Sequence, residues 1–218
     1  YEQAHPELAA EFRRRIAGEL PADWQATVRV LVARADEKGE TVATRKASQD
    51  VIQWVAAEVP ELIGGSADLA PSTLTLIKDG GSVEKGSYAG RNLHFGIREF
   101  GMGTIVNGLV LSGFRAFGAG FLIFSDYMKA SIRLAALMRI PSTFVFTHDS
   151  IGLGEDGPTH QPIEQLAMLR AMPNLNVVRP AGANEVALAW QFAINATDTP
   201  TLFALSRYVE VSLFPYAV

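Results

Sequence analysis

The sequence predicts an α/β domain, with a mostly parallel sheet flanked by helices on both faces. Short apolar runs of strand length alternate with helix-period segments of roughly 10 to 15 residues. This alternation implies βαβ units, whose strands are parallel and buried on both sides. The expected strands are 62–64, 93–95, 114–117, 143–147, 176–178 and 202–205. The expected helices are 45–59, 99–112, 124–139, 162–171 and 184–195.

The N-terminal region is predicted to precede the compact domain. Pro6 and Glu7 are expected to open a helix that Gly18 with Pro21 closes, because apolar residues recur every four positions at Leu8, Phe12, Ile16 and Leu20. Residues 22–41 have a mixed pattern, with a polar turn expected at 36–40. We therefore expect an arm or linker helix with its connecting segment at 1–41 and the compact domain at 42–218. Glycines in the segment 79–90 predict a flexible loop.

Composition excludes several classes of partner. The 218 residues are 48% hydrophobic and 19% charged, with a formal net charge of -4. Nucleic acid and anionic membranes need basic patches, so neither is an expected partner. No cysteine is present, which excludes disulfides and thiolate metal sites and is compatible with the cytoplasm. The sequence starts at Tyr1 without a methionine and has no signal peptide, so we expect a fragment or an excised domain.

Polar side chains cluster where the predicted strands end. Residues 66–68 follow the first strand, 96–99 the second, 119–121 the third and 148–160 the fourth, while Arg207 follows the last. In an open parallel sheet, ligands bind beyond the carboxyl ends of the strands. Five polar clusters at one edge therefore indicate a binding site there.

Glu99 opens a helix that is nearly free of charge as far as residue 112. A carboxylate in apolar surroundings needs a partner, a proton or a function. A structural ion pair with Arg98 or Arg115 is the alternative. Three aromatic residues recur at spacings of three further on, at Phe121, Phe124 and Tyr127. Such aromatics are usually core residues, but with a buried acid they suit a flat, basic heteroaromatic cofactor.

The segment 147–162 is the most polar of the chain. It contains Gly152-x-Gly154-x-x-Gly157, formally a dinucleotide fingerprint, but four residues separate the strand from Gly152 and prolines delay the helix. That context disfavours a nicotinamide cofactor. Zinc or iron ligands are a second interpretation, although no helical H-x-x-x-H spacing occurs among His148, Asp149, Glu155, Asp156 and His160. Two interpretations remain: a loop that hydrogen-bonds a polyhydroxylated or phosphorylated substrate, and a polar loop with a helix cap.

Three segments together resemble the pyrimidine-binding middle domain of transketolase. They are Gly65-Ser66-Ala67-Asp68-Leu69-Ala70-Pro71-Ser72, the run from His94 to Met102, and Thr147 through Pro162. The resemblance covers about residues 42 to 207, and the first helix looks like the family's linker from its first domain. It implies a thiamine diphosphate-binding fold and a transferase of the pentose phosphate pathway. The reaction would move a two-carbon ketol unit between sugar phosphates.

The resemblance also implies roles for individual residues. Glu99 would hydrogen-bond N1′ of the cofactor's aminopyrimidine and activate it, with His148 and His160 as further catalytic residues. Phe121, Phe124 and Tyr127 would form the ring pocket, with Asp68 and Leu69 near the cofactor. Those that would bind the substrate are Arg45, Ser72, His148, Asp156, His160 and Arg207. The sequence after Arg207, Tyr208-Val209-Glu210-Val211, departs from the family's usual polar continuation.

The family's diphosphate and metal site is missing, because no Gly-Asp-Gly occurs. We expect no metal ligands in this chain, with a magnesium or calcium ion held by a separate diphosphate-binding domain. The chain alone is then expected to be inactive, and as part of the enzyme to form a homodimer. The alternatives are a dihydroxyacetone synthase, a deoxyxylulose phosphate synthase, or a non-catalytic dimerisation module.

Overall fold

The fold is a parallel α/β sheet, seen in a computed structural model that describes residues 1–38 and 41–209. Within this part of the chain, six strands form one sheet in the order β2-β1-β3-β4-β6-β5. Every neighbouring pair is parallel, which confirms the predicted fold class. The strands are β1 (Leu62–Ser66), β2 (Asn92–His94), β3 (Arg115–Phe121), β4 (Thr143–Thr147), β5 (Asn176–Val178) and β6 (Thr201–Ala204).

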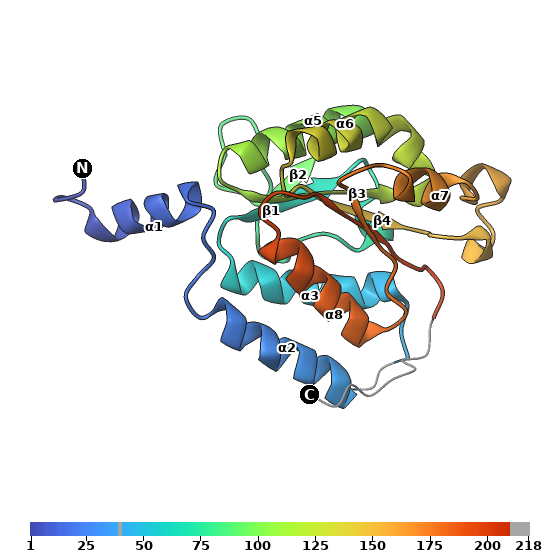
Figure 1. Ribbon diagram of the computed structural model, residues 1–218, viewed down its shortest axis with the longest axis horizontal. Helices are drawn as coiled ribbons and strands as arrows, with labels where there is room; N and C mark the ends of the chain where they lie inside the picture. The colour runs from blue at the N-terminus through green and yellow to red at the C-terminus, as the bar shows by residue number, and fades with distance from the viewer. Residues whose placement is uncertain (39–40, 210–218) are drawn as a thin grey trace.

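Helices cover both faces of this sheet (Figure 1). On one face lie α5 (Glu99–Leu111) and α6 (Ser125–Met138), and on the other lie α3 (Thr44–Glu58), α8 (Ala183–Asn195) and α2 (Trp24–Lys38). The remaining helices are α1 (Pro6–Ile16), α4 (Ala70–Thr73) and α7 (Gln165–Arg170). Among the described residues, none of these helices is both long and apolar enough to cross a membrane.

Each face of the sheet has its own hydrophobic core. Phe117, Trp190 and Phe203 belong to the core under α3 and α8, while Met102 and Phe144 belong to the core under α5 and α6. All five side chains are at most 1% exposed. Burial on this scale contributes roughly 1.5 to 3 kcal/mol for each large apolar side chain.

Glycines allow α5 to pack closely against its neighbours. A methyl group at Gly118 of β3 would lie 3.0 Å from Cγ of Met102, and one at Gly103 would overlap Ser131 of α6.

β3 runs to Phe121, so the expectation that residues 119–121 follow this strand is wrong. Gly118, Ala119 and Gly120 have low strand propensity, so the sequence pattern does not show that the strand continues to Phe121. Small residues are placed there because α5 packs closely against the strand.

The connection into the domain also differs from expectation. Residues 36–38 belong to α2, so the predicted turn at 36–40 is wrong for them; Gly39 and Glu40 lie outside the described residues. Trp24 and Val28 of α2 are at most 2% exposed and join the core under α8. By contrast, the helix α1 extends from the sheet layers (Figure 1). The boundary at residue 42 stays a prediction.

Candidate functional site

The aromatic side chains at the carboxyl edge of the sheet form a continuous stack. Phe121 ends β3, and its ring lies 5.9 Å from that of Phe124 with an interplanar angle of 9°. Phe124 in turn lies 6.1 Å from Tyr127, at 29°. The stack runs from the core outward, since Phe121 is 6% exposed and Tyr127 is 67% exposed. It presents a flat apolar surface where the chain leaves the sheet.

Both predicted site histidines contact this stack. The ring centroid of His148 lies 3.7 Å from that of Phe121, and His160 lies 5.3 Å from Phe124. Each imidazole Nδ1 pairs with the hydroxyl of the preceding threonine at 2.8 Å, Thr147 for His148 and Thr159 for His160. These hydrogen bonds fix the rings, and leave each Nε2 for another partner.

His148 is held neutral by its surroundings. It is buried, and its backbone is left-handed with φ 57°. Burial, followed by the positive charge of Arg45, lowers the pKa of His148 to about 4, and Arg207 acts in the same direction. The carboxylate of Asp156 opposes this shift. These electrostatic effects place His148, Arg45, Arg207 and Asp156 around one region of the edge.

The two predicted arginines lie beside each other at the ends of two elements. Thr44 and Ser206, which precede Arg45 and Arg207, exchange buried hydrogen bonds, including Ser206 N to Thr44 Oγ1 at 2.7 Å. Arg45 donates from Nη1 to the carbonyl of Ser72 at 2.5 Å, while its buried Nε has no partner. Burial and the charge of Arg207 lower the pKa of Arg45. Two like charges kept this close favour an anion between them.

Arg207 is also tied to the loop that follows β4. Its guanidinium donates to the carbonyl of Leu153 and pairs with Glu155 at 3.0 Å. Asp156 is exposed beside this pair. The glycine-rich segment forms short 3₁₀ turns at Ile151–Leu153 and Pro158–His160 instead of a strand-glycine-helix unit. This arrangement lacks the context of a dinucleotide fingerprint.

Glu99 is the first residue of α5 and is 8% exposed. None of the hydrogen bonds or ion pairs in the described residues involves its carboxylate, and Arg98 and Arg115 donate to backbone carbonyls instead. The expected alternative, an ion pair with either arginine, is absent from the described structure. The helix N-terminus favours a negative charge here. One turn after Glu99, Gly103 packs against Ser131 of α6, so the helix that Glu99 opens lies against the helix that carries Tyr127.

Asp68 and Leu69 follow β1 next to an open cleft. The cleft has a volume of about 460 Å³ and is lined by Gln49, Ser66, Asp68, Ala70, Pro71, Leu74, Leu76, His94 and Gly96. Asp68 is exposed with φ 62°, a conformation that non-glycine residues rarely adopt. Ser66 Oγ accepts the amide hydrogen bond of Leu69 at 3.2 Å. The cleft thus adjoins the edge between β1 and β2.

Several residues that hold the site together were not predicted as site residues. Asp149 is buried and accepts a hydrogen bond from Arg179 Nε at 2.6 Å. The sequence pattern indicated Asp149 only as a candidate metal ligand, and in the described residues no cluster of three or more His, Asp or Glu side chains is suited to a metal. Tyr208 reaches Ser150 Oγ at 3.1 Å. No sequence signal pairs residues 30 to 59 positions apart, although Arg179 and Tyr208 do follow strands.

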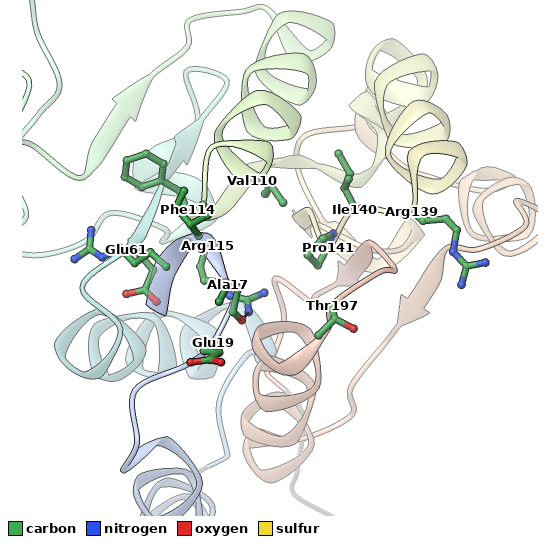
Figure 2. A pocket seen from close by; sticks show the side chains of 14 residues that line it. Ala17, Glu19, Glu61, Val110, Phe114, Arg115, Arg139, Ile140, Pro141 and Thr197 are labelled. Carbon is green, nitrogen blue, oxygen red and sulfur yellow. Dashed lines mark hydrogen bonds between the residues drawn. The ribbon is translucent and has the colours of Figure 1, made fainter. Parts of the chain in front are cut away.

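A second hollow, of about 220 Å³, lies at the opposite, amino edge of the sheet. Figure 2 shows Glu61, Arg115 and Arg139 among its lining side chains. Their charged groups already have partners: Arg14 pairs with Glu61 at 2.8 Å, Arg139 pairs with Asp198 at 2.7 Å, and Arg115 donates to the carbonyls of Gly18 and Ala196. Residues 15–19 of the N-terminal segment also line this hollow. It lies at the edge of the sheet opposite the predicted site, and its charged groups hold the N-terminal segment in place.

Fold and site together define a parallel α/β domain with stacked aromatic rings, a buried acid and two arginines at the carboxyl edge of its sheet. The family model described as the transketolase pyrimidine binding domain matches residues 40–209. The chain belongs to this family.

Similar proteins agree with this assignment. A transketolase of Geobacillus stearothermophilus is 56% identical over 208 residues, which are 95% of this chain and 30% of that protein. A Pichia stipitis transketolase solved with sedoheptulose-7-phosphate has a TM-score of 0.89 and 46% identity, over 98% of this chain and 32% of its own. A split gene transketolase, described as an inactive β4 tetramer, has a TM-score of 0.66 and 26% identity, over 82% of this chain and 56% of its own. The chain thus spans about a third of the full-length relatives.

Proposed function

We propose that this chain is the pyrimidine-binding part of a thiamine diphosphate-dependent transketolase that transfers a two-carbon ketol unit from a ketose to an aldose phosphate. The observation that carries the proposal is Glu99, a carboxylate 8% exposed and without a partner in the described residues, at the start of α5. A buried acid without a partner is expected where a ligand supplies the partner.

The residues fit the aminopyrimidine ring of the cofactor. The stack of Phe121, Phe124 and Tyr127 offers an apolar surface for a planar ring. Glu99 would hold a proton at N1′ of that ring. When bound, thiamine diphosphate supplies the carbanion chemistry that breaks a ketose beside its carbonyl. Asp68 and Leu69 would lie near the cofactor from the neighbouring strand end.

The substrate would lie against the arginines and histidines of the same edge. Arg45 and Arg207, with Ser72 and His148, would bind the phosphate, since guanidinium groups match its oxygens in a planar fork. Neutral His148 can accept or donate a hydrogen bond at Nε2, and His160 would bind the reacting hydroxyls. Asp156 would accept from the hydroxyl next to the carbonyl and so read its configuration.

We propose that a second domain completes this site. Metal-binding clusters are absent from the described residues, and we propose that a diphosphate-binding domain holds a magnesium or calcium ion and the diphosphate. Exposed apolar side chains on α5 and α6, among them Phe100, Ile105 and Leu137, support a homodimer. The split gene relative bears the description inactive, and we expect inactivity of this chain alone. The pentose phosphate pathway and a cytoplasmic location belong to the same proposal.

The test is a thiamine diphosphate titration with magnesium, by calorimetry, on this chain alone and on the full-length protein. We expect weak binding and no ketol transfer from the chain alone, and tight binding with transfer in the full-length protein. Substrate profiling of the full-length protein distinguishes transketolase from the two related synthases. Tight, magnesium-dependent binding to the isolated chain would contradict the proposed division of the site.

A further inference from the structure

Asp149 is a buried acid for which the proposed reaction has no direct use. Its side chain is 2% exposed, and it directly follows His148, whose backbone is left-handed. The pKa shift of His148 depends on burial, Arg45, Asp156, Arg207 and His160. The carboxylate of Asp149 pairs instead with Arg179.

Its partners come from the two strands that lie next in the sheet. The sheet order is β4, β6, β5 at this side. Asp149 follows β4, Tyr208 follows β6 and Arg179 follows β5. Arg179 Nε donates to Asp149 Oδ2 at 2.6 Å, and the Tyr208 hydroxyl lies 3.5 Å from Oδ1. One carboxylate thus bridges the ends of three adjacent strands.

The same bridge reaches the loop that carries the predicted substrate residues. The Tyr208 hydroxyl lies 3.1 Å from Ser150 Oγ, and Ser150 Oγ accepts from the amide of Gly152. The Tyr208 ring packs on Gly152, where an added methyl group would lie 3.4 Å from ring carbon Cε1. Tyr208 directly follows Arg207, and Gly152 directly precedes Leu153. The bridge therefore lies next to both residues of the hydrogen bond from Arg207 to the carbonyl of Leu153.

We propose that Asp149, held by Arg179 and Tyr208, is a positioning residue that fixes the loop 150–160 against Arg207 for binding of a phosphorylated substrate. This inference rests on the proposed function for its substrate. The Arg179 side chain is 39% exposed but Asp149 is buried, so removal of Arg179 would leave a buried carboxylate without its charged partner. The Tyr208 hydroxyl adds a neutral contact to Oδ1, the second carboxylate oxygen of Asp149.

The experiment compares variants of the full-length protein with matched controls. Arg179→Gln and Tyr208→Phe break the bridge, and the double variant Asp149→Asn with Arg179→Gln replaces the ion pair by two neutral amides. Arg139→Gln removes an exposed ion pair of comparable length at the amino edge, at 2.7 Å, and so controls for the loss of a surface charge. Tyr88→Phe is the matched control for the hydroxyl, since Tyr88 is 74% exposed. Tyr208→Phe keeps the aromatic ring, so this variant is the least expected to disturb the fold.

Three quantities separate positioning from a general loss of stability. For Arg179→Gln we expect the KM for a ketose phosphate to rise about tenfold, as for a weakened charged contact, with a smaller fall in kcat, since the loop also carries His160, and with the thiamine diphosphate Kd unchanged. The KM for hydroxypyruvate, which has no phosphate, should change little. Tyr208→Phe should show the same pattern more weakly, and the double variant should recover part of the loss. Equal losses on both substrates, or an unchanged KM, would overturn the inference.

Hydrogen exchange gives a result that does not depend on activity. Amides of 150–160 should exchange faster in Arg179→Gln and Tyr208→Phe than in the wild type or the two controls. If the wild type transfers no ketol unit, the proposed function fails, while the exchange rates still decide whether the bridge holds the loop. Unchanged exchange in this segment would overturn the bridge even in an active enzyme.

Discussion

The imidazole of His148 lies against the ring of Phe121, with their centroids 3.7 Å apart and their planes at 30°. Phe121 ends β3 and His148 follows the adjacent β4, and the two strands pair in register at Phe121 and Thr147. The surface proposed for the cofactor ring and the residue proposed for substrate binding are thus in direct contact. This contact helps to bury His148, and burial is the main cause of its lowered pKa.

His148 should titrate far below an ordinary histidine. Burial first, then Arg45 and Arg207, lower its pKa to about 4. NMR titration of its ring protons in this chain, assigned with His148→Gln, should therefore give a pKa near 4. Arg45→Gln should raise the value and Asp156→Asn should lower it. A titration near the ordinary value of about 6.5 would contradict the described burial.

The lowered pKa of His148 also predicts that the stability of the chain depends on pH. The unfolded chain binds a proton at His148 near pH 6.5, whereas the folded chain binds it only near pH 4. The free energy of unfolding contributed by neutral His148 is therefore fully present above pH 6.5 and declines as the pH falls toward 4. Urea unfolding at several pH values should show this decline, and His148→Gln should reduce it.

Arg45 should act on phosphorylated substrates alone. In the full-length protein, Arg45→Gln should raise the KM for sugar phosphates by about 10- to 100-fold, since a charged hydrogen bond contributes about 1.5 to 3 kcal/mol. Hydroxypyruvate should be affected little. Lys46→Gln is the matched control, because Lys46 is exposed and pairs with Asp50 on the same helix. Comparable effects of the two variants would remove Arg45 from the phosphate site.

The linker helix should depend on one ion pair. Arg14 donates to Glu61 through both terminal nitrogens, at 2.8 and 2.9 Å, and the Glu61 side chain is only 2% exposed. Arg14→Ala should release α1 and make residues 1–20 sensitive to protease in this chain. Arg13→Ala should not, because Arg13 is 60% exposed and pairs with an exposed glutamate. Equal cleavage of both variants would show that α1 is held by other contacts.

The apolar surface of α5 and α6 should form the dimer contact. Ile105 is 48% exposed, and further exposed apolar side chains on these helices are Phe100, Leu111, Leu134, Leu137 and Met138. Ile105→Glu should weaken self-association by about tenfold or more in sedimentation velocity, as expected for a charge in an apolar contact. Leu188→Glu on α8 is the control, at 37% exposure. A wild-type chain that stays monomeric at high concentration would rule out this dimer surface.

Strand positions could be predicted from the sequence because fully buried strands consist of continuous apolar runs. β4 is predicted to the residue, and all five of its positions are buried. The pattern of α2 was harder to see, although Trp24, Val28 and Leu31 do recur at helical spacing. Charged residues between them weaken the pattern, and it is packing against α8 that decides the structure there.

The site was predictable where its residues share a strand end, and not where they meet across the sheet. Placing Glu99, Phe121 and His148 at one edge needs only a parallel sheet. The partners of Asp149 depend on the strand order, which puts β6 beside β4 and β5 beyond β6, although β5 precedes β6 in the chain. The hydrogen bonds between Thr44 and Ser206 likewise join residues that are far apart in the sequence, by 162 positions. Such contacts have no local signal.

Glu99→Gln in the full-length protein tests the central claim most directly, with Glu58→Gln as a control outside the site. Glutamine keeps the size of the side chain but cannot exchange a proton with N1′ of the cofactor. The account predicts that kcat falls by about 10² to 10⁴, as for loss of a general acid or base, with slower hydrogen exchange at the thiazolium C2 and a level or higher melting temperature. A variant that loses stability but keeps its exchange rate would make Glu99 a structural residue, and the proposed mechanism would be wrong.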